Sequence, residues 1–302
     1  MTSDLVKYIA ARKKELNAVI LAHYYQLPEI QDNADFVGDS LQLARKAAET
    51  DAEVIVCCGV HFMAESAKIL NPSKTVLIPE VKAGCPMADM VTADKLRKMK
   101  EKHKDARVVC YVNSSAEVKA ESDICCTSSN AVQVVNSIPE GTEIIFVPDR
   151  NLGAYVAGQT GRKIILWEGF CPVHDVVTSE EIEEQKKKHP EAKIVVHPEC
   201  PPEVTAMADA VRSTAGILKY VKESKDREFI IGTEEGFLYT LTKNCPDKTF
   251  YLARNNFICH DMKTITLENL ALALEKRQYE VEISEDIRKK ASHALERMIA
   301  LG

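Results

Sequence analysis

The sequence contains no CxxC pair and no long apolar run, and each absence removes a class of protein. Ordinary zinc ribbons and ferredoxin-type sites use CxxC pairs, so neither is expected. A membrane span needs about 20 apolar residues in a row, and no segment approaches that length. The first residues are typical of an amphipathic helix that leads into a strand, without the apolar core of a signal peptide. We therefore expect a soluble, cytoplasmic protein with no membrane partner.

An excess of positive charge is also missing. The chain has 39 Lys and Arg against 45 Asp and Glu, a net charge of −6 at pH 7, and the basic residues are scattered. Proteins that bind nucleic acids gather Lys and Arg on one face. Nucleic acid is therefore not expected as a partner, whereas a small anion in a local pocket is compatible with this composition.

Cysteine is plentiful, with ten residues in a chain that is expected to stay in a reducing compartment, where disulfides are rare. Five cysteines lie in apolar segments and are expected to be small buried side chains: Cys57, Cys58, Cys110, Cys125 and Cys126. Three others each follow an apolar run at regular intervals. Cys85 and Cys171 are 86 residues apart, and Cys171 and Cys259 are 88 apart. One thiol thus recurs in each third of the chain.

A second pattern has the same period. It consists of Glu followed by Ile or Val, then Asp six positions after the Glu, then Ser or Thr five positions after the Asp. Its three occurrences are Glu29, Asp35 and Ser40; Glu117, Asp123 and Ser128; and Glu203, Asp209 and Thr214. Because two independent features share one period, the sequence predicts a triplicated unit with one thiol in each copy.

Each unit alternates continuous apolar strands with helices, which indicates a parallel sheet covered on both faces. The sequence predicts an α/β fold with three similar three-layer α/β/α units, arranged with pseudo-threefold symmetry around a central site. The expected repeats span residues 1–86, 87–172 and 173–262. The C-terminal helices of residues 263–302 are expected to pack back on the first repeat.

Polar side chains follow the first strand of every repeat. Six residues before the repeat glutamates are His23, Tyr111 and His197, and four residues before them are Tyr25, Asn113 and Glu199. Ligands bind beyond the carboxyl ends of the strands in open parallel sheets. One boundary histidine is ordinary in a structural role, but six polar residues at equivalent positions predict a central pocket if the units surround one axis.

Hydroxyl side chains stand where the second helix of each repeat is expected to begin: Ser40, Ser128 and Thr214, with Thr127 and Ser213 beside two of them. Such residues are expected to be N-caps. Helix N-termini also bind anions through free N–H groups and a partial positive charge. Three of them around one cavity would form a receptor for about three anionic groups.

Three converging thiolates have several possible uses. They suit a 4Fe-4S cluster in which one iron lacks a cysteine ligand, or zinc with three cysteines and a water. An open metal polarises an oxygen as a Lewis acid, which suits dehydration of a hydroxy acid. The spacing alone leaves the cluster, zinc and unligated core thiols open. An iron–sulfur redox or iron sensor and a zinc-dependent triose phosphate aldolase are the alternative functions.

Long motifs in all three repeats resemble the quinolinate synthase family. They include LAHYYQLPEIQDNADFVGDSL, YVNSSAEVKAESDICCTSSNA, GFCPVH, VHPECP and CHDMKTITLENL, in this order over nearly the whole chain. The resemblance implies three α/β units around one 4Fe-4S cluster. It also implies condensation of iminoaspartate with dihydroxyacetone phosphate to quinolinate, the ring precursor of NAD, with loss of phosphate and water. An enzyme that produces iminoaspartate is the partner this chemistry implies.

The resemblance also assigns residues. It places the cluster on Cys85, Cys171 and Cys259, with one iron not ligated by cysteine. The pocket it implies consists of His23, Tyr25, Ser40, Tyr111, Asn113, Ser128, His174, His197, Glu199, Ser213 and Thr214, of which His174 comes from the resemblance alone. Glu199 and Tyr25, with His23 and His197 near them, are expected to move protons. Ser213 and Thr214 are expected to bind phosphate, and Ser40, Ser128 and Asn113 to bind carboxylates.

Overall fold

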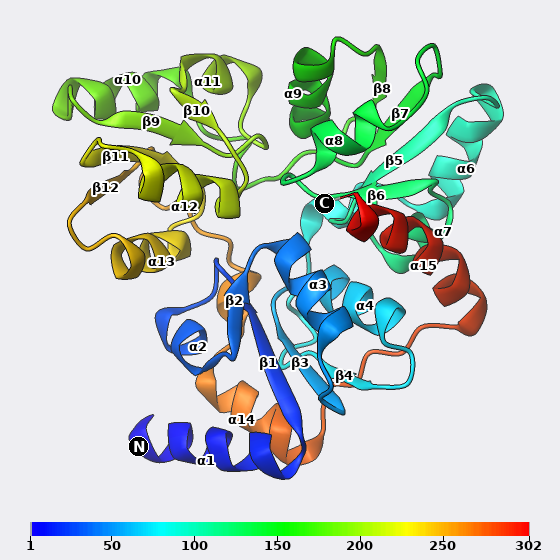
Figure 1. Cartoon of the computed structure of the whole chain (residues 1–302), viewed down its shortest axis with the longest axis vertical. Coiled ribbons are helices and arrows are strands. Elements are labelled where there is room, and N and C mark those ends of the chain that lie inside the picture. Colours follow the sequence, from blue (N-terminus) through cyan, green and yellow to red (C-terminus); the bar gives the residue numbers. More distant parts are fainter. Residues whose placement is uncertain (1, 302) are drawn as a thin grey trace.

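Three parallel four-stranded sheets organise the computed structural model, which describes residues 2–301. The strand orders are β2-β1-β3-β4, β6-β5-β7-β8 and β10-β9-β11-β12, so each sheet places its first strand second and its fourth strand last. Figure 1 shows the three units grouped around a common centre. The prediction of an α/β fold with three similar units is confirmed, while its pseudo-threefold symmetry stays a prediction.

The first unit follows an N-terminal helix, α1 (Thr2–Glu15). Its strands are β1 (Ala18–His23), β2 (Phe36–Gly38), β3 (Val54–Cys58) and β4 (Thr75–Leu77). Its helices are α2 (Pro28–Asn33), α3 (Ser40–Glu49) and α4 (His61–Leu70). Every residue of β3 is buried, as expected for a parallel strand covered on both faces.

The second unit repeats this plan after two short connecting helices, α5 (Pro86–Asp89) and α6 (Ala93–Lys102). Its strands are β5 (Arg107–Tyr111), β6 (Ile124–Cys126), β7 (Ile144–Val147) and β8 (Ile164–Leu166). Its helices are α7 (Ala116–Ala120), α8 (Ala131–Asn136) and α9 (Arg150–Thr160).

The five cysteines expected in the core of the first and second units are all buried, which confirms their assignment as small packing residues.

The third unit begins with α10 (Ser179–Lys188). Its strands are β9 (Lys193–Val196), β10 (Ala210–Val211), β11 (Glu228–Gly232) and β12 (Thr249–Leu252). Its helices are α11 (Pro202–Met207), α12 (Thr214–Glu223) and α13 (Gly236–Asn244). A short 3₁₀ turn, η1 (Met262–Thr264), leads to the last two helices, α14 (Leu267–Lys276) and α15 (Glu285–Ala300). Across residues 2–301, no helix is both long and apolar enough to span a membrane.

The repeated aspartate has the same structural task in every unit. Its carboxylate Oδ2 accepts a hydrogen bond from a backbone N–H in the first strand of its own sheet. The pairs, in repeat order, are Asp35 with Ile20 (2.9 Å), Asp123 with Val108 (2.8 Å) and Asp209 with Ile194 (2.8 Å). The aspartate precedes the edge strand of each sheet, and its hydrogen bond ties this segment to the first strand. The period in the sequence therefore reflects a bond that recurs in every unit.

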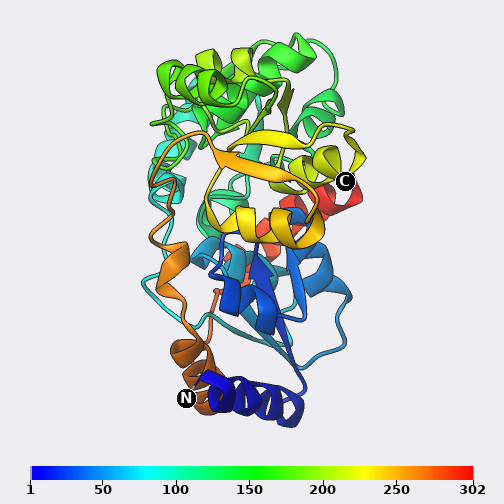
Figure 2. The same cartoon turned by 90° about the vertical axis from the view of Figure 1, so that its left-hand side faces the viewer.

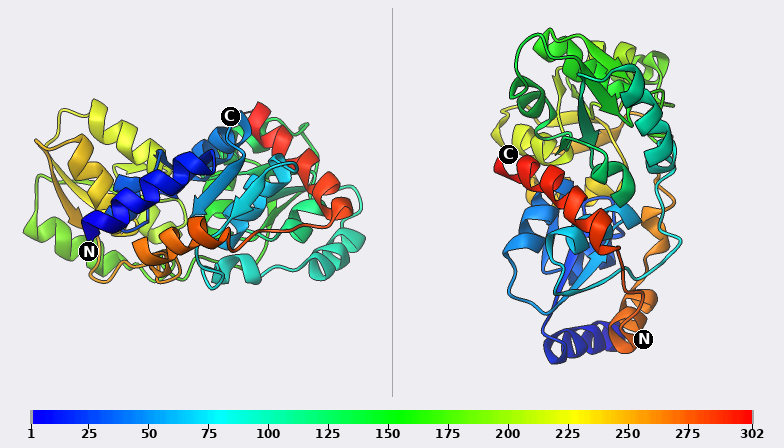
Figure 3. Two further views of the ribbon diagram at one scale, coloured as in Figure 1. Left: turned by 90° about the horizontal axis from the view of Figure 1, so that it is seen from below. Right: turned by 90° about the vertical axis from the view of Figure 1, so that its right-hand side faces the viewer.

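The two C-terminal helices differ in what they cover. The sequence predicts that both pack back on the first repeat. α14 lies beside α1 and contacts β3, and Figures 2 and 3 show the two helices together at one end of the molecule. α15 contacts α3 and α4 of the first unit and also α7 and β6 of the second. Helix α15 thus lies at the junction between two units (Figure 3), and its buried residues include Ala291, Leu295 and Met298.

Candidate functional site

A cavity of about 350 Å³ lies where the three units meet, and all three contribute to its walls. It holds every residue predicted for the site except Ser213. The predicted residues that line it are His23, Tyr25, Ser40, Cys85, Tyr111, Asn113, Ser128, Cys171, His174, His197, Glu199, Thr214 and Cys259. The fold therefore brings together side chains that are separated by more than two hundred residues in the sequence.

The strand ends deliver the polar side chains as the repeat predicts. His23 and Tyr111 are the last residues of β1 and β5, and His197 directly follows β9. Contacts between units show how closely these ends approach. The Tyr111 hydroxyl donates to Oε1 of Glu199 at 2.7 Å, and Nε2 of His197 lies 3.1 Å from Oγ of Ser128. The second and third units thus meet through hydrogen bonds inside the cavity.

Glu199 is an ionised carboxylate in a buried setting, with 3% of its surface exposed. Burial alone raises the pKa of a carboxyl group. His197 and His174 and the hydrogen bonds from His174 and Tyr111 oppose that effect and hold the pKa of Glu199 at about 2. Nδ1 of His174 lies 2.8 Å from Oε2. Glu199 is therefore a proton acceptor at neutral pH.

Two histidines and two tyrosines of the cavity stay uncharged. Burial, with a smaller effect of His197, lowers the pKa of His23 to about 3, and burial lowers the pKa of His197 to about 3. Burial and the nearby Glu199 raise the pKa of Tyr25 and of Tyr111 well above the usual value. The cavity thus combines the Glu199 carboxylate with two neutral imidazoles and two intact phenols, which suits proton transfer.

Thr233, which the sequence reasoning missed, joins two of these groups from behind the cavity wall. Its Oγ1 lies 2.6 Å from the Tyr25 hydroxyl and 2.9 Å from Nε2 of His174. Thr233 is completely buried at the end of β11. A first-unit phenol is thereby connected to the imidazole next to Glu199.

The three recurring thiols are half-buried, and their surroundings keep them protonated without a metal. Burial raises the pKa of Cys85 to about 12, that of Cys171 well above its usual value and that of Cys259 to about 11. Such thiols ionise when a cation binds them. Their positions therefore suit metal ligands better than free nucleophiles.

Two buried acids fix the backbone of two of these thiols, and sequence reasoning missed both. Oδ2 of Asp149 accepts from the backbone N–H of Cys171 at 3.2 Å, and Oε1 of Glu234 accepts from that of Cys259 at 3.1 Å. Each acid stands two residues beyond the third strand of its unit, where the first unit has Val60. Aligning the repeats at this strand end would have revealed the pair.

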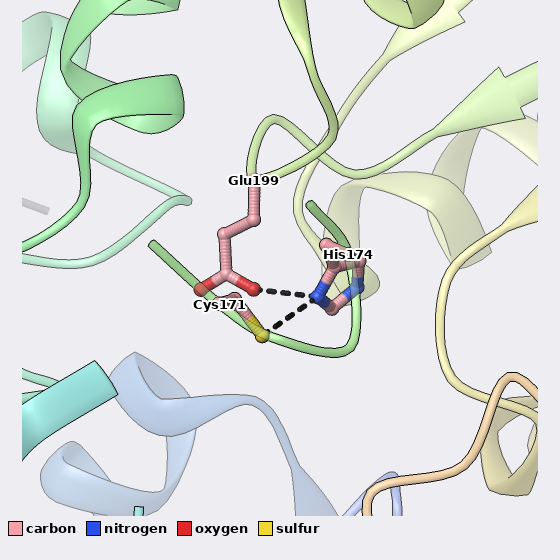
Figure 4. Close-up of side chains that lie close together, drawn as sticks. All are labelled: Cys171, His174 and Glu199. Atoms are coloured by element: carbon pink, nitrogen blue, oxygen red, sulfur yellow. Dashed lines mark hydrogen bonds and ion pairs between the residues drawn. The ribbon is translucent and has the colours of Figure 1, made fainter. Parts of the chain in front are cut away.

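A compact group of metal-ligand atoms lies at the centre of the cavity. Sγ of Cys171, a ring nitrogen of His174 and a carboxylate oxygen of Glu199 are all within 4.8 Å of one another (Figure 4). Thiolate, imidazole and carboxylate are all ligands of metals such as zinc. Cys200, next to Glu199, points its thiol toward the Gly232 carbonyl at 3.5 Å and does not line the cavity. The site therefore contains a possible metal-binding group.

The N-cap prediction is confirmed for Ser213 in the third unit and is wrong by one residue in the first unit. Ser40 and Thr214 are the first residues of α3 and α12, and the caps are Asp39 and Ser213. Asp39 accepts from the N–H of Gln42 at 2.9 Å, and Ser213 from that of Gly216 at 3.2 Å. The Ser213 hydroxyl also bonds Ser129, outside the cavity lining. Capping by the preceding residue leaves Ser40 and Thr214 on the cavity wall.

The second unit departs further from the expected arrangement. Ser128 lies three residues before α8, whose N-cap is Asn130 without a side-chain capping bond. Ser128 instead meets His197 from the third unit. Nearby, the buried Oδ1 of Asn113 has no hydrogen-bond partner in the described part of the chain. An unpaired polar atom on a cavity wall is an expected feature of a ligand-binding side chain.

A buried carboxylate, neutral imidazoles and a thiol-bearing metal-ligand group in one cavity define an enzyme of the α/β class with a central site between three units. The chain belongs to the family described as quinolinate synthetase A protein, whose profile matches residues 7–300. It is 55% identical to a quinolinate synthase of Desulforudis audaxviator, over 100% of this chain and 99% of the relative. The chain is also 55% identical to quinolinate synthase 1 of Methanosarcina acetivorans, over 99% of this chain and 98% of the relative. It is 56% identical to a quinolinate synthase of Dehalococcoides mccartyi, over 99% of this chain and 99% of the relative.

Proposed function

We propose that this protein acts as a quinolinate synthase in the de novo synthesis of NAD. It condenses iminoaspartate with dihydroxyacetone phosphate to quinolinate and releases phosphate and water. The observation that carries the proposal is the single cavity in which one thiol from each third of the chain meets the polar strand ends of all three units. Membership of the family and the names of relatives at about 55% identity support the same reaction.

Cys85, Cys171 and Cys259 would hold a 4Fe-4S cluster, and the donor set fits it. Zinc at about 2.3 Å from three sulfurs would bring them within about 4 Å of one another. Within residues 2–301 the three cysteines do not form so close a group, which favours a larger centre with its ligands at separate corners. The other seven cysteines do not line the cavity, so one iron would lack a cysteine ligand. When bound, this iron supplies Lewis-acid chemistry for dehydration.

The substrates are anionic, and the hydroxyl and amide side chains on the cavity wall suit them. Thr214, at the first position of α12, is assigned to the phosphate, with Ser213 as the cap that fixes the helix start. Ser40, Ser128 and Asn113 are assigned to the carboxylates. The partial positive charge at the N-terminus of the ten-residue helix α12 supports anion binding there, whereas the Asp39 side chain caps α3.

Proton transfer falls to Glu199 and the groups bonded to it. As an ionised carboxylate, Glu199 accepts a proton during isomerisation of the triose and imine formation. Tyr111, bonded to Glu199 at 2.7 Å, and Tyr25 keep their protons and can donate them to a developing oxyanion. The neutral His23 and His197 line the same cavity and complete the acid–base set.

An iron count and an absorption spectrum on anaerobically purified protein test the proposal. About four irons and four sulfides per chain with brown colour are expected, together with quinolinate formation from the two substrates. Cys171→Ser should lose both cluster and activity, whereas Glu199→Gln should keep the cluster and stop turnover. One zinc per chain would favour a triose phosphate aldolase. A cluster without turnover would favour an iron or redox sensor.

The cellular setting is part of the same proposal. All ten cysteines are free thiols, as expected in the reducing cytoplasm. An enzyme that produces iminoaspartate would be the partner, because an imine hydrolyses in water and is lost unless it is used soon after it forms. Faster quinolinate formation when both enzymes share one reaction vessel, compared with delayed mixing, would support this partnership.

A further inference from the structure

Cys171, His174 and Glu199 form a set of metal ligands that uses only one of the three cysteines assigned to the cluster. Nδ1 of His174 lies 3.2 Å from Sγ of Cys171 and 2.8 Å from Oε2 of Glu199. Figure 4 shows dashed lines from this ring nitrogen to both the thiol and the carboxylate. We propose that these three side chains bind one zinc ion when the protein lacks its iron–sulfur cluster.

The distances suit zinc after small movements of the side chains. Zinc binds sulfur at about 2.3 Å and nitrogen or oxygen at about 2.0–2.2 Å, so tetrahedral ligands are about 3.3–3.6 Å apart. The two measured separations are 2.8 and 3.2 Å, and all three ligand atoms lie within 4.8 Å of one another. An ion would thus need shifts of at most about 1 Å in side chains that already lie close together.

Outer hydrogen bonds orient two of the three ligands. Nε2 of His174 lies 2.9 Å from Oγ1 of Thr233, and Oε1 of Glu199 accepts from the Tyr111 hydroxyl at 2.7 Å. With zinc on Nδ1, the ring proton of His174 moves to Nε2 and donates to Thr233, whose hydroxyl can accept as well as donate. Such partners fix the tautomer and the direction of a ligand. Thr233 and Tyr111 therefore support a metal without moving.

Burial and access also favour a bound ion. His174 and Glu199 are only 1% and 3% exposed, so a cation would compensate a carboxylate that is held away from water. All three ligands line the cavity, so the fourth zinc position faces open space. Three protein ligands and one open position are typical of zinc sites that accept a small molecule.

Cys171 belongs to both metal centres, so zinc and the cluster exclude each other. This consequence depends on the cluster ligands assigned under the proposed function, whereas zinc binding itself does not. Zinc that enters first would take the sulfur which the cluster needs and would also occupy Glu199. Free zinc is therefore expected to block cluster assembly and to compete at the position of the reacting groups.

Zinc binding by cluster-free protein is measured by anaerobic equilibrium dialysis, with cobalt(II) as a coloured substitute. The wild type is expected to bind one zinc per chain, and its cobalt form to show a thiolate charge-transfer band. His174→Ala and Glu199→Gln should each weaken zinc binding at least about tenfold. Loss of a residue that only hydrogen-bonds a metal ligand already lowers metal affinity by about this factor. Cys171→Ser should abolish the cobalt band.

Cys85→Ser and Cys259→Ser are the matched controls, because they remove a cluster ligand and leave the zinc ligands intact. Both should lose the cluster and keep wild-type zinc affinity, with circular dichroism reporting the fold. If they weaken zinc as much as His174→Ala does, the three cysteines hold the ion and the proposal is wrong. Absence of stoichiometric zinc in the wild type would overturn it as well.

A reconstitution experiment tests the exclusion separately. Protein preloaded with zinc is expected to take up iron and sulfide in inverse proportion to the zinc it keeps. Full uptake of both metals would show that they do not share Cys171. Zinc is counted on cluster-free protein and without turnover, so this test does not depend on the proposed reaction. Failure of the proposed reaction would instead appear as wild-type protein that has no cluster or forms no quinolinate.

Discussion

The hydroxyl of Thr233 lies 2.6 Å from the phenol oxygen of Tyr25 and 2.9 Å from Nε2 of His174. Ionised Glu199 only accepts hydrogen bonds, so Nδ1 of His174 donates to it. Thr233 joins Nε2 of the same ring to the phenol of Tyr25. Tyr111 donates to Glu199 from the other side. The two tyrosines therefore end one chain of hydrogen bonds, in which Thr233 connects Tyr25 to His174.

Replacing Thr233 by valine tests this link, because valine keeps the shape and removes the hydroxyl. The kcat of Thr233→Val is expected to fall about tenfold to a hundredfold, as is typical when an outer orienting partner is lost. The KM values and the iron content should change little. Thr233→Ser restores the hydroxyl and should recover most of the rate. Equal activity of the valine and serine variants would contradict a positioning role.

Thr214 and Ser213 are adjacent hydroxyls with different expected roles. Thr214 lines the cavity, so Thr214→Ala should raise the KM for dihydroxyacetone phosphate about tenfold, the effect of losing one hydrogen bond to a charged group. Ser213 caps α12, so Ser213→Ala should lower the free energy of unfolding by about 1 kcal/mol and raise this KM less. Steady-state kinetics and denaturant unfolding measure the two effects. An unchanged KM in both variants would refute the phosphate assignment.

Asp149 and Glu234 should matter for cluster assembly although neither is assigned as a ligand. Each carboxylate accepts one N–H from a cysteine segment and a second from the following helix: Asp149 bonds Cys171 and Leu152, and Glu234 bonds Cys259 and Gly236. An amide offers only one acceptor oxygen, so one of the two bonds is lost. Asp149→Asn and Glu234→Gln are expected to lower the iron bound per chain.

The control for these variants is Asp247→Asn, at an exposed turn position of the third unit. It makes the same charge change on the surface and should leave the iron content at the wild-type level. Iron and sulfide assays after anaerobic purification measure the difference. Full iron content in both acid variants would show that the backbone of the thiol segments is held by other contacts.

The features predicted from sequence are those that depend on short segments. Apolar runs and the repeat period locate strand ends, so His23 and Tyr111 were placed correctly. The cap of the first unit was missed by one residue because Asp39 and Ser40 are both able to cap, and the backbone angles at the helix start decide between them. Thr233 could not be found in this way, since its role depends on how the first and third units pack.

The repeated aspartates give a test of the triplicate architecture itself. Replacing each by alanine removes one bond from the carboxylate to the first strand and one ion pair with a nearby base. The three variants are Asp35→Ala, Asp123→Ala and Asp209→Ala, whose basic partners are Lys13, Arg107 and Lys193. Each should lower the free energy of unfolding by a similar amount, about 1–2 kcal/mol, because a partly exposed charged hydrogen bond contributes at the low end of its range.

The pH dependence of this effect has a defined sign at Asp209. Burial is the largest single effect and raises its pKa, but the hydrogen bonds from Ile194 and Lys193 and the charge of Lys193 together lower the pKa below the usual value. A carboxyl group with a lowered folded-state pKa stabilises the protein above its unfolded pKa of about 3.9, and this contribution is lost as the pH falls through the folded value. The difference between wild type and Asp209→Ala should therefore shrink between about pH 7 and about pH 3.

Urea unfolding of the three variants measures these differences, with alanine at the exposed loop residues Asp51, Asp105 and Asp247 as controls, one in each unit. The controls should change the free energy of unfolding by less than about 0.5 kcal/mol. Similar losses at the repeated positions are expected because the same bond, at 2.8–2.9 Å, recurs in every unit. A large loss at one position and none at the other two would mean that the shared sequence period does not correspond to a shared stabilising role.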